Sequence, residues 1–291
     1  MGAAAVFLNE GAGSARSARV RRAVDLTRRA LDADLHVTAT RDAGELASWL
    51  AARITDYSTA VIAGGDGSLG AAYNVAAGRE GLVLGYLPAG FGNAAAHLLR
   101  LPKSPEGLAE VLARGEARPI DLVAVDGRLA LFAGAGWDAI VAGRYADAGA
   151  RRVRGWTSAI LQSLPDLWRR GSVEVRADGW VVHRGQVELL VVGTTPFYGR
   201  GLKVNPGARP DAGRMSLRVY PGPAPRLAAE AARWTLRLLP RAPRVDARHI
   251  EIRSLDGRPI PLQADGDVVG AREGWSLHLR PSVVRLIGRW S

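Results

Sequence analysis

The chain has 291 residues, is 47% hydrophobic, contains no cysteine and carries a formal net charge of +11. This composition excludes disordered and collagen-like proteins, and the lack of cysteine excludes disulfides and a cysteine zinc site. Residues 1–117 hold 12 basic and 12 acidic residues, whereas residues 118–291 hold 27 and 16, so the excess positive charge lies entirely in the second part.

The first part of the chain alternates short apolar stretches with segments of helical periodicity. The pattern predicts strands at residues 3–8, 35–40, 58–63 and 82–87, and helices at 14–31, 43–53, 69–77 and 94–99. Strands that alternate with helices join by right-handed crossovers, so we expect a parallel sheet with helices on both faces. Residues 1–117 are therefore interpreted as an α/β domain.

The rhythm changes after residue 118, where short strands separated by Asp-Gly turn signals predominate. Strands are predicted at residues 120–125, 129–135, 173–177, 186–193, 215–220, 250–254, 261–264 and 275–279, and helices at 153–168 and 226–239. We interpret residues 118–291 as a mainly antiparallel, β-rich domain with helical insertions. No linker separates the two domains, so we expect them to share a cleft.

A glycine-rich loop, Gly64-Gly65-Asp66-Gly67-Ser68, follows the third predicted strand. Consecutive glycines let the backbone approach phosphate oxygens, and the N-terminus of the following helix adds N–H donors. The alternative is an ordinary glycine-rich turn. A Rossmann fingerprint is excluded, because the pattern should follow the first strand and precede an acidic residue at the end of the next one.

The second loop, Pro88-Ala89-Gly90-Phe91-Gly92-Asn93, follows the fourth predicted strand and should lie beside the first at the same edge of the sheet. Asn93 suits the N-cap of the next helix as well as it suits a ligand contact. Two adjacent glycine loops at the carboxyl edge are hard to explain by structure alone. A nucleotide phosphate tail accounts for both.

Other motifs follow in order along the chain: Asn9-Glu10-Gly11-Ala12-Gly13, Thr40, Ile120-Asp121-Leu122, Gly136-Trp137-Asp138-Ala139, Tyr198-Gly199-Arg200-Gly201 and Asp265-Gly266-Asp267. Together with the two glycine loops, this ordered set resembles the diacylglycerol kinase catalytic-domain family, which includes bacterial lipid kinases and sphingosine and ceramide kinases. The resemblance implies a two-domain enzyme with ATP and Mg²⁺ in the interdomain cleft, transferring the γ-phosphoryl group to a lipid hydroxyl of the diacylglycerol or sphingoid type.

The resemblance also implies roles for individual residues. The nucleotide-binding residues are Asn9, Thr40, Gly64, Gly65, Asp66, Gly67, Ser68, Gly90, Gly92 and Asn93. Catalysis falls to Asp265, with Asp267 beside it, and to Asp66, which would hold Mg²⁺ with the ATP phosphates. Asp121 and Asp138 are acceptor-site candidates. The alternative for Asp265 is a simple hairpin turn, because Asp-Gly is common there.

Four positions depart from the family pattern. Phe91 replaces a threonine that contacts phosphate, Ala94 replaces an acidic residue, and Glu10 replaces a proline. Ala212 replaces the second aspartate of a D-D-G motif that holds a structural magnesium in some bacterial lipid kinases, so no structural Mg²⁺ site is expected and Asp211 is left as a turn residue. Because these polar groups are lost, two alternatives stay open: a weak kinase, or a nucleotide-binding member of the family without activity.

Two other functions compete with lipid phosphorylation. NAD kinases share the first loop but lack the pattern at residues 88–93, and a basic nucleic-acid binder would explain the charge but not the two loops. We therefore expect no nucleic-acid partner, and a homodimer is left open.

A membrane-surface substrate suits residues 144–170, which include the helix predicted at 153–168. Its apolar stripe consists of Val153, Trp156, Ile160, Leu164, Leu167 and Trp168, and Arg151, Arg152, Arg154, Arg169 and Arg170 flank it. Such a helix can lie at a bilayer interface, although packing into the core is the more usual role. Because no stretch approaches the roughly 20 apolar residues that span a bilayer, we expect a cytoplasmic protein at the inner face of the membrane.

Overall fold

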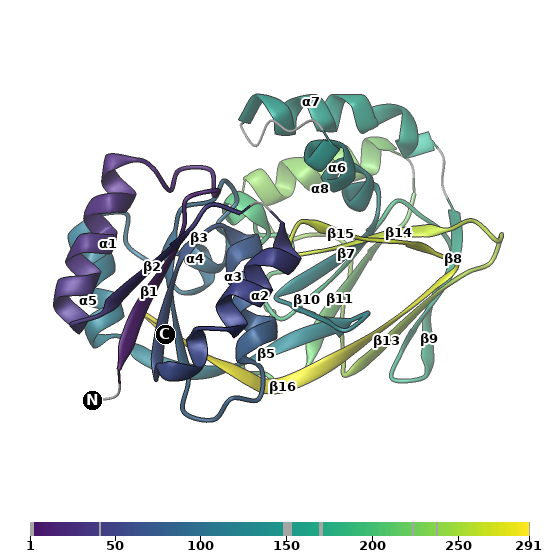
Figure 1. The fold of residues 1–291 in the computed structure, drawn as a ribbon. Helices are drawn as coiled ribbons and strands as arrows, with labels where there is room; N and C mark the ends of the chain where they lie inside the picture. The colour runs from purple at the N-terminus through teal and green to yellow at the C-terminus, as the bar shows by residue number, and fades with distance from the viewer. Residues whose placement is uncertain are drawn as a thin grey trace. The chain divides into compact units, whose positions relative to one another are not determined.

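The computed structural model describes residues 3–40, 42–147, 153–168, 171–222, 224–236 and 238–290. The chain forms two compact units (Figure 1). Unit 1 comprises Met1–Ile120, Gly199–Gly201 and Ser282–Ser291, and unit 2 comprises Asp121–Tyr198 and Leu202–Pro281. Each unit is described by itself.

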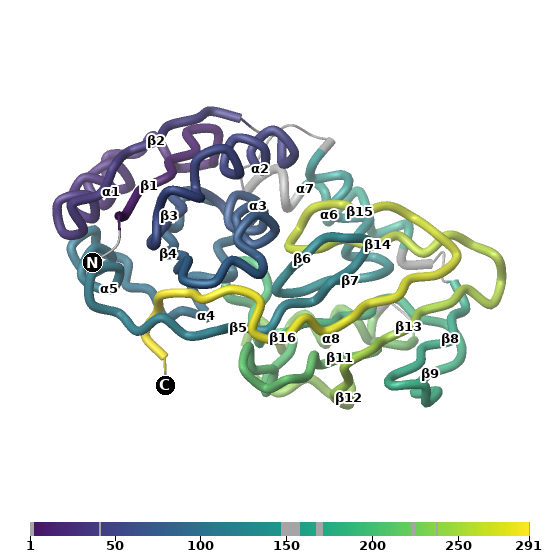
Figure 2. Tube along the Cα trace, turned by 60° about the horizontal axis from the view of Figure 1, so that its bottom comes forward, coloured from purple at the N-terminus to yellow at the C-terminus, as the bar shows by residue number. Residues whose placement is uncertain are grey.

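Unit 1 is built on a parallel sheet. Its strands are β1 (Ala4–Asn9), β2 (Asp34–Thr38), β3 (Thr59–Gly64) and β4 (Val83–Pro88), in the order β2-β1-β3-β4. Near the C-terminus, Arg285 and Leu286 of β16 (Gly274–Gly288) pair in parallel with β4 (Figure 2). The predicted parallel sheet is confirmed.

Five helices pack around this sheet in the described part of unit 1. They are α1 (Ala18–Leu31), α2 (Ala43–Ala51), α3 (Asp66–Ala76), α4 (Ala94–Leu98) and α5 (Pro105–Arg114). A short 3₁₀ turn, η1 (Ile54–Asp56), follows α2. Figure 1 shows α1 and α5 on one face of the sheet and α2 and α3 on the other, so the predicted two-sided cover is confirmed.

Local sequence explains where these helices begin. Ser17 and Asp42 accept hydrogen bonds from Val20 N–H and Glu45 N–H, so they cap α1 and α2. Helix α5 was not predicted, although Ser104 caps it by accepting from Gly107 N–H and Pro105 occupies its first turn. Apolar residues of α1, α5, β1 and β3 fill the core between helices and sheet.

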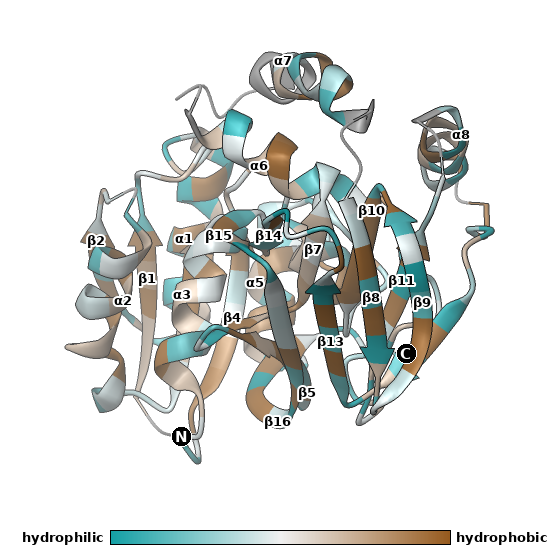
Figure 3. Ribbon diagram, turned by 90° about the vertical axis from the view of Figure 1, so that its right-hand side faces the viewer, coloured by the Kyte–Doolittle hydropathy of each residue, from teal (hydrophilic) through white to brown (hydrophobic). Residues whose placement is uncertain are grey.

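Unit 2 contains two antiparallel groups of strands. One has the order β12-β11-β10-β7-β14-β15, with bounds β12 (Arg244–Ala247), β11 (Met215–Tyr220), β10 (Leu189–Gly193), β7 (Phe132–Gly136), β14 (Ile260–Ala264) and β15 (Asp267–Arg272). The other places residues 274–278 of β16 beside β13 (His249–Ser254), β8 (Gly171–Ala177) and β9 (Trp180–Val187). A buried core that draws residues from both groups joins them, and β13 alternates apolar and polar residues accordingly (Figure 3).

The remaining elements of unit 2 include its helices. Residues 123–125 of β5 (Glu116–Val125) pair with β6 (Arg128–Ala130). The helices are α6 (Trp137–Asp147), α7 (Val153–Ser163) and α8 (Ala224–Thr235). Two 3₁₀ turns are present, η2 (Leu164–Trp168) and η3 (Gly199–Gly201), and the latter is grouped with unit 1. The predicted β-rich domain with helical insertions is confirmed.

Several predicted boundaries were wrong. The strand predicted at residues 186–193 is the end of β9 and the whole of β10, because the chain changes sheets at Glu188. The helix predicted at 153–168 ends at Ser163, because Pro165 lacks the N–H that would continue it. Helix α6 and strands β12 and β15 were not predicted. The Asp-Gly turns at residues 126–127 and 178–179 are confirmed, with positive φ at all four positions.

The predicted membrane helix falls partly outside the described residues. Arg151, Arg152, Arg169 and Arg170 are not described, and of the apolar stripe only Ile160 and Leu164 have described side chains. Leu164 is exposed, as is its neighbour Leu161. Within the described ranges, every helix is too short or too polar to cross a bilayer.

Candidate functional site

The first glycine loop, residues 64–68, joins β3 to α3. It is tighter than predicted, because α3 begins at Asp66 and not at residue 69. Gly65 is the N-cap and offers no side-chain cap, which leaves the first-turn amides of α3 to other acceptors. Ser68 is buried, and its hydroxyl accepts a hydrogen bond of 3.2 Å from Asn9 Nδ2. The loop is therefore held to the end of β1.

The second glycine loop, residues 88–93, is braced by Asn93. The Oδ1 atom of Asn93 accepts from Gly90 N–H and from the Tyr86 hydroxyl, both at 2.9 Å, and Nδ2 donates to the Gly90 carbonyl at 2.9 Å. Asn93 adopts a left-handed conformation with φ of 47° and makes no side-chain cap to α4. The N-cap interpretation was thus wrong in its hydrogen bonding, since the side chain closes the loop instead.

The two loops approach each other so closely that glycine is required. A Cβ atom on Gly90 would lie 2.5 Å from Gly65 Cα, and a Cβ on Gly92 would lie 2.7 Å from Asp66 Oδ2. The Ala89 N–H also donates to the Gly64 carbonyl at 2.7 Å. The prediction that the loops lie side by side at the carboxyl edge is confirmed, and Asp66 is the acidic residue at their junction.

A third loop, residues 9–14, completes this end of the sheet. Asn9 Oδ1 accepts from Gly11 N–H at 2.9 Å, and Ser14 N–H donates to the Ala89 carbonyl at 2.8 Å. A Cβ on Gly11 would lie 2.4 Å from the Thr40 carbonyl oxygen. The Thr40 hydroxyl donates to Glu45 at 2.6 Å, at the start of α2. The structure thus brings together all the residues that were predicted to bind nucleotide.

Residues 199–201 add a segment that the sequence analysis did not place here. Arg200 N–H donates to the Gly92 carbonyl at 2.7 Å, and the Arg200 guanidinium carbon lies 4.8 Å from the centre of the Phe91 ring. The backbone of Arg200 is left-handed, with φ of 62°. No local signal could have predicted this contact, because more than a hundred residues separate the two positions in the sequence.

In unit 2, Asp265 occupies the two-residue turn between β14 and β15. Its φ is 49° and that of Gly266 is 92°, as such a turn requires. Its carboxylate accepts hydrogen bonds from the N–H groups of Leu131 and Phe132, each at 3.1 Å. Asp265 is therefore fixed at the start of β7. The neighbouring Asp267 is exposed.

Asp178 has the same local structure as Asp265 but no match to a family motif. It also precedes a glycine in a hairpin turn, with φ of 48°, and it accepts from Arg248 N–H and His249 N–H at 2.9 Å. The turn geometry alone therefore does not distinguish a proton acceptor from a structural aspartate, and the catalytic role of Asp265 stays a prediction.

Asp138 lies in the first turn of α6, in contact with β14. Its Oδ2 atom accepts from Gln263 Nε2 at 3.0 Å, while its Oδ1 atom is buried without a hydrogen-bond partner among the described residues. Burial raises the pKa of the Asp138 carboxyl to about 7. Gln263 Oε1 in turn accepts from Gly266 N–H at 2.7 Å, so one amide links Asp138 to the turn of Asp265.

Tyr198 lies beside this group. Burial and, next, the nearby Asp138 carboxylate raise the pKa of the Tyr198 hydroxyl well above its usual value, and this hydroxyl donates to the Ala133 carbonyl at 3.2 Å. We call Asp138, Tyr198, Gln263 and Asp265 the carboxylate cluster. Gln263 was not predicted as a site residue, because the strand expected at residues 261–264 does not by itself indicate that Asp138 lies beside it.

The other acceptor-site candidate, Asp121, is buried. Its Oδ2 atom accepts from Gly213 N–H at 2.7 Å, and its N–H donates to the Pro210 carbonyl. Asp121 thus holds the loop at residues 209–213, in which Asp211 is exposed and paired with Arg209 at 3.1 Å. A contact between Asp121 and an acceptor stays a prediction.

The described residues offer few side chains that could bind Mg²⁺ without a nucleotide. Within the described residues, no three His, Cys, Asp or Glu side chains gather as a metal site would need. At the glycine loops, Ala94 is buried where the family pattern has an acid, which leaves Asp66. Mg²⁺ commonly binds through one or two carboxylates together with substrate phosphates. The residues therefore fit an ion that arrives with a nucleotide.

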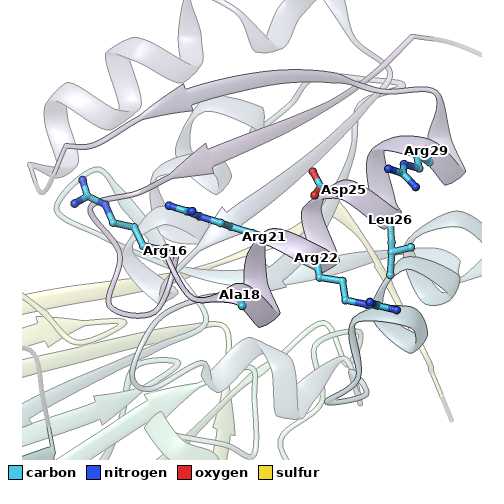
Figure 4. A pocket seen from close by; sticks show the side chains of 7 residues that line it. All are labelled: Arg16, Ala18, Arg21, Arg22, Asp25, Leu26 and Arg29. Carbon is cyan, nitrogen blue, oxygen red and sulfur yellow. The ribbon is translucent and has the colours of Figure 1, made fainter.

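A separate depression of about 640 Å³ runs along α1 (Figure 4). Its lining consists of Arg16, Ala18, Arg21, Arg22, Asp25, Leu26 and Arg29. None of the predicted site residues lines it, and two of its arginines pair with acidic neighbours, Arg16 with Glu10 and Arg22 with Glu106. It is interpreted as the solvated face of a charged helix.

Comparison with known proteins identifies the family. A family model described as the diacylglycerol kinase catalytic domain matches residues 3–125, and one described as the YegS C-terminal NAD kinase beta sandwich-like domain matches residues 132–288. Together the two models cover most of the chain, which belongs to the family that pairs a diacylglycerol kinase catalytic domain with a YegS-type C-terminal domain. No curated protein sequence matches it.

Solved structures show the same fold. The chain is similar to a diacylglycerol kinase from Bacillus anthracis str. Sterne, with a TM-score of 0.73, 17% identity, and coverage of 99% of this chain and 97% of the other. The chain is also similar to a candidate diacylglycerol kinase from the same organism, with a TM-score of 0.77 and 19% identity. That match covers 99% of this chain and 97% of the other. An NAD kinase from Archaeoglobus fulgidus in complex with ATP is similar with a TM-score of 0.56 and 15% identity. That match covers 99% of this chain and 93% of the other.

Proposed function

We propose that this member of a kinase family transfers the γ-phosphoryl group of ATP to the hydroxyl of a lipid. The observation that carries the proposal is the close approach of two glycine loops beside Asp66, with a Cβ on Gly90 excluded by Gly65 Cα at 2.5 Å. Bare backbone at a helix N-terminus binds phosphate well. A lipid acceptor is supported by the match to the diacylglycerol kinase catalytic domain over residues 3–125.

In this proposal the glycine loops hold the phosphates and Asp66 holds the magnesium ion that accompanies ATP. The ion neutralises charge on the phosphates when bound. The backbone supplies N–H donors from fixed positions, because Asn93 braces the second loop and Asn9 holds the first through Ser68. Phosphoryl transfer depends mainly on such positioning, so it does not require a catalytic lysine.

The acceptor hydroxyl must lose a proton during transfer, and the carboxylate cluster supplies the candidates. Asp265, with Asp267 beside it, is the proposed proton acceptor. Asp138 is proposed to contact the acceptor, since its buried Oδ1 atom has no partner among the described residues. A buried oxygen without a donor is costly, and a ligand hydroxyl would supply one.

The test is phosphoryl transfer from radiolabelled ATP with magnesium, using purified protein and a panel of diacylglycerol, sphingoid base, ceramide and NAD presented separately. Label in one of the lipids supports the proposal and identifies the acceptor. Label in NAD overturns the lipid assignment and favours an NAD kinase-like enzyme, which the shared fold with an NAD kinase keeps open.

A nucleotide-binding protein without kinase activity is the other candidate. Two changes at the second loop favour it, since Phe91 and Ala94 replace polar residues of the family pattern. MgATP binding without label in any acceptor would establish this candidate. A peripheral membrane contact through residues 144–170 is proposed with the lipid substrate. Changing Arg151, Arg152 and Arg154 together to Glu should weaken salt-sensitive binding to anionic vesicles.

A further inference from the structure

We propose that Arg200 binds the terminal phosphates of the nucleotide and that the Phe91 ring holds its guanidinium in place for this contact. The inference rests on the proposed function and assigns a cation to a site that otherwise offers backbone amides and Asp66. Arg200 is an exposed arginine whose backbone and side chain both contact the second glycine loop.

The backbone of residues 199–201 is seated on that loop. Arg200 N–H donates to the Gly92 carbonyl at 2.7 Å, and a Cβ on Gly199 would lie 3.7 Å from Gly92 Cα. A Cβ on Gly201 would lie 2.6 Å from the His97 ring, so a larger residue would displace the segment. Arg200 keeps a left-handed backbone, with φ of 62° and ψ of 19°. Strain of this kind concentrates at functional sites.

The side chain is placed by the ring of Phe91. The guanidinium carbon lies 4.8 Å from the ring centre, within the range of a cation–π contact. Stacking on a ring face leaves the N–H groups in the guanidinium plane available to other acceptors. Arg200 has no ion pair and no side-chain hydrogen bond in the part of the chain that the structure describes, and it is exposed. An oriented cation without an anion is therefore present.

The surroundings select phosphate as that anion. Asp66 and residue 199 both lie close to Gly92, since a Cβ on Gly92 would lie 2.7 Å from Asp66 Oδ2 and 3.5 Å from Gly199 Cα. Arg200 therefore follows directly after a residue that adjoins both the second loop and the carboxylate expected to meet the metal ion. The guanidinium fork matches two phosphate oxygens, and such pairs are stronger than neutral hydrogen bonds. Charge on a transferred phosphoryl group is stabilised in the same way.

The test is calorimetric binding of MgATP, MgADP, AMP and inorganic tripolyphosphate to the full chain and its variants. Arg200→Ala should weaken the binding of MgATP and tripolyphosphate by about 10-fold or more, as expected for a lost charged hydrogen bond. The affinity for AMP should be unchanged. Phe91→Leu should weaken MgATP binding by less than Arg200→Ala does. The double variant should be no weaker than Arg200→Ala, because Phe91 acts through Arg200.

The matched control is Arg53→Ala. Arg53 also stacks on a ring, with its guanidinium carbon 5.2 Å from the Trp49 ring centre, and lies in the same unit outside the glycine loops. This variant should bind all four probes as the unaltered protein does. If melting shows Arg200→Ala to be unfolded, Arg200→Gln replaces it with the same expectation.

Unchanged MgATP affinity in a folded Arg200 variant would overturn the inference while leaving the proposed function intact. An equal loss for AMP and MgATP would also overturn it, because the residue would then support the fold of the site and not the terminal phosphates. If the unaltered protein binds none of the nucleotides, the proposed function fails and this inference fails with it.

Discussion

The glycine loops of unit 1 and the carboxylate cluster of unit 2 are built in different ways. The loops offer backbone, and their shape depends on Cβ atoms that are absent at Gly65, Gly90 and Gly92. The cluster offers side chains, which α6, β14 and the turn after β14 bring together. A substitution in the loops should therefore act by filling space, whereas one in the cluster should act by removing charge or a hydrogen bond.

The largest effect is expected from Gly65→Val. The new side chain would begin 3.2 Å from Gly90 Cα and would grow into the space between the loops. We expect calorimetry to detect no MgATP binding while the protein stays folded. The matched control is Gly70→Val in α3, where a Cβ would meet no atom within 4 Å. Unchanged MgATP affinity in a folded Gly65→Val variant would show that the nucleotide does not bind at these loops.

Asp265→Asn tests whether the cluster carries chemistry. A general base contributes on the order of 10²–10⁴ in rate, so kcat should fall by that factor while MgATP affinity is retained. Asp178→Asn is the control, because Asp178 lies in the same kind of turn and also accepts from two consecutive backbone N–H groups, those of Arg248 and His249. Equal losses in the two variants would show a structural effect. Full activity of Asp265→Asn would leave Asp267 or Asp66 as the base.

The pH dependence of stability in Asp138→Asn tests whether the carboxylate cluster contains a buried, neutral carboxyl group. Because burial raises the pKa of Asp138 from 3.8 to about 7, the folded state holds a proton that the unfolded chain releases between these values. The free energy of unfolding therefore falls as pH rises through this range. Asparagine cannot ionise, so we expect the variant to be more stable at about pH 8, by up to roughly 4 kcal/mol, with a smaller difference at about pH 5.

Urea unfolding at the two pH values measures this difference. Asp211→Asn is the control, because Asp211 is exposed and paired with Arg209. A stability difference for Asp138→Asn that is the same at both pH values would show that the carboxyl is not buried as a neutral acid. The experiment does not depend on catalysis, so it tests the cluster independently of the proposed function.

A smaller effect is expected from Asn93→Ala in the second glycine loop. The change removes the hydrogen bonds to Gly90 and to the Tyr86 hydroxyl and leaves alanine in a left-handed conformation, at a cost of about 2 kcal/mol. Asn93→Gly loses the same bonds but tolerates the backbone, so it should be less destabilised. Urea unfolding compares them. Equal stability of all three proteins would show that the loop is not braced by Asn93.

The two sites also differed in how well the sequence predicted them. The glycine loops follow strands directly, so hydrophobic patterning located them, and the close approach of the loops followed from the geometry of a parallel sheet. The start of α3 at Asp66 was missed because Gly65 provides no capping side chain to indicate it. Asn93 occupies the N-cap position of α4, but its role as a loop brace could not be predicted, because a cap and a brace use the same side chain.

The carboxylate cluster could be predicted only in part. Motif matching named Asp138 and Asp265, but the amide of Gln263 that links Asp138 to the turn of Asp265 depends on strand pairing that no local pattern records. The contact between Arg200 and Phe91 has the same origin, since it joins residues far apart in the sequence. Short-range signals predict backbone sites well, and sites made of side chains from distant strands require the fold.

The most direct test of the account is a crystal structure of the protein with magnesium and a non-hydrolysable ATP analogue. We expect phosphate oxygens within hydrogen-bond distance of backbone N–H groups of residues 64–68 and 90–92, with the metal ion beside Asp66. A nucleotide bound elsewhere, or one whose phosphates point away from both glycine loops, would contradict the assignment of these loops as the phosphate site.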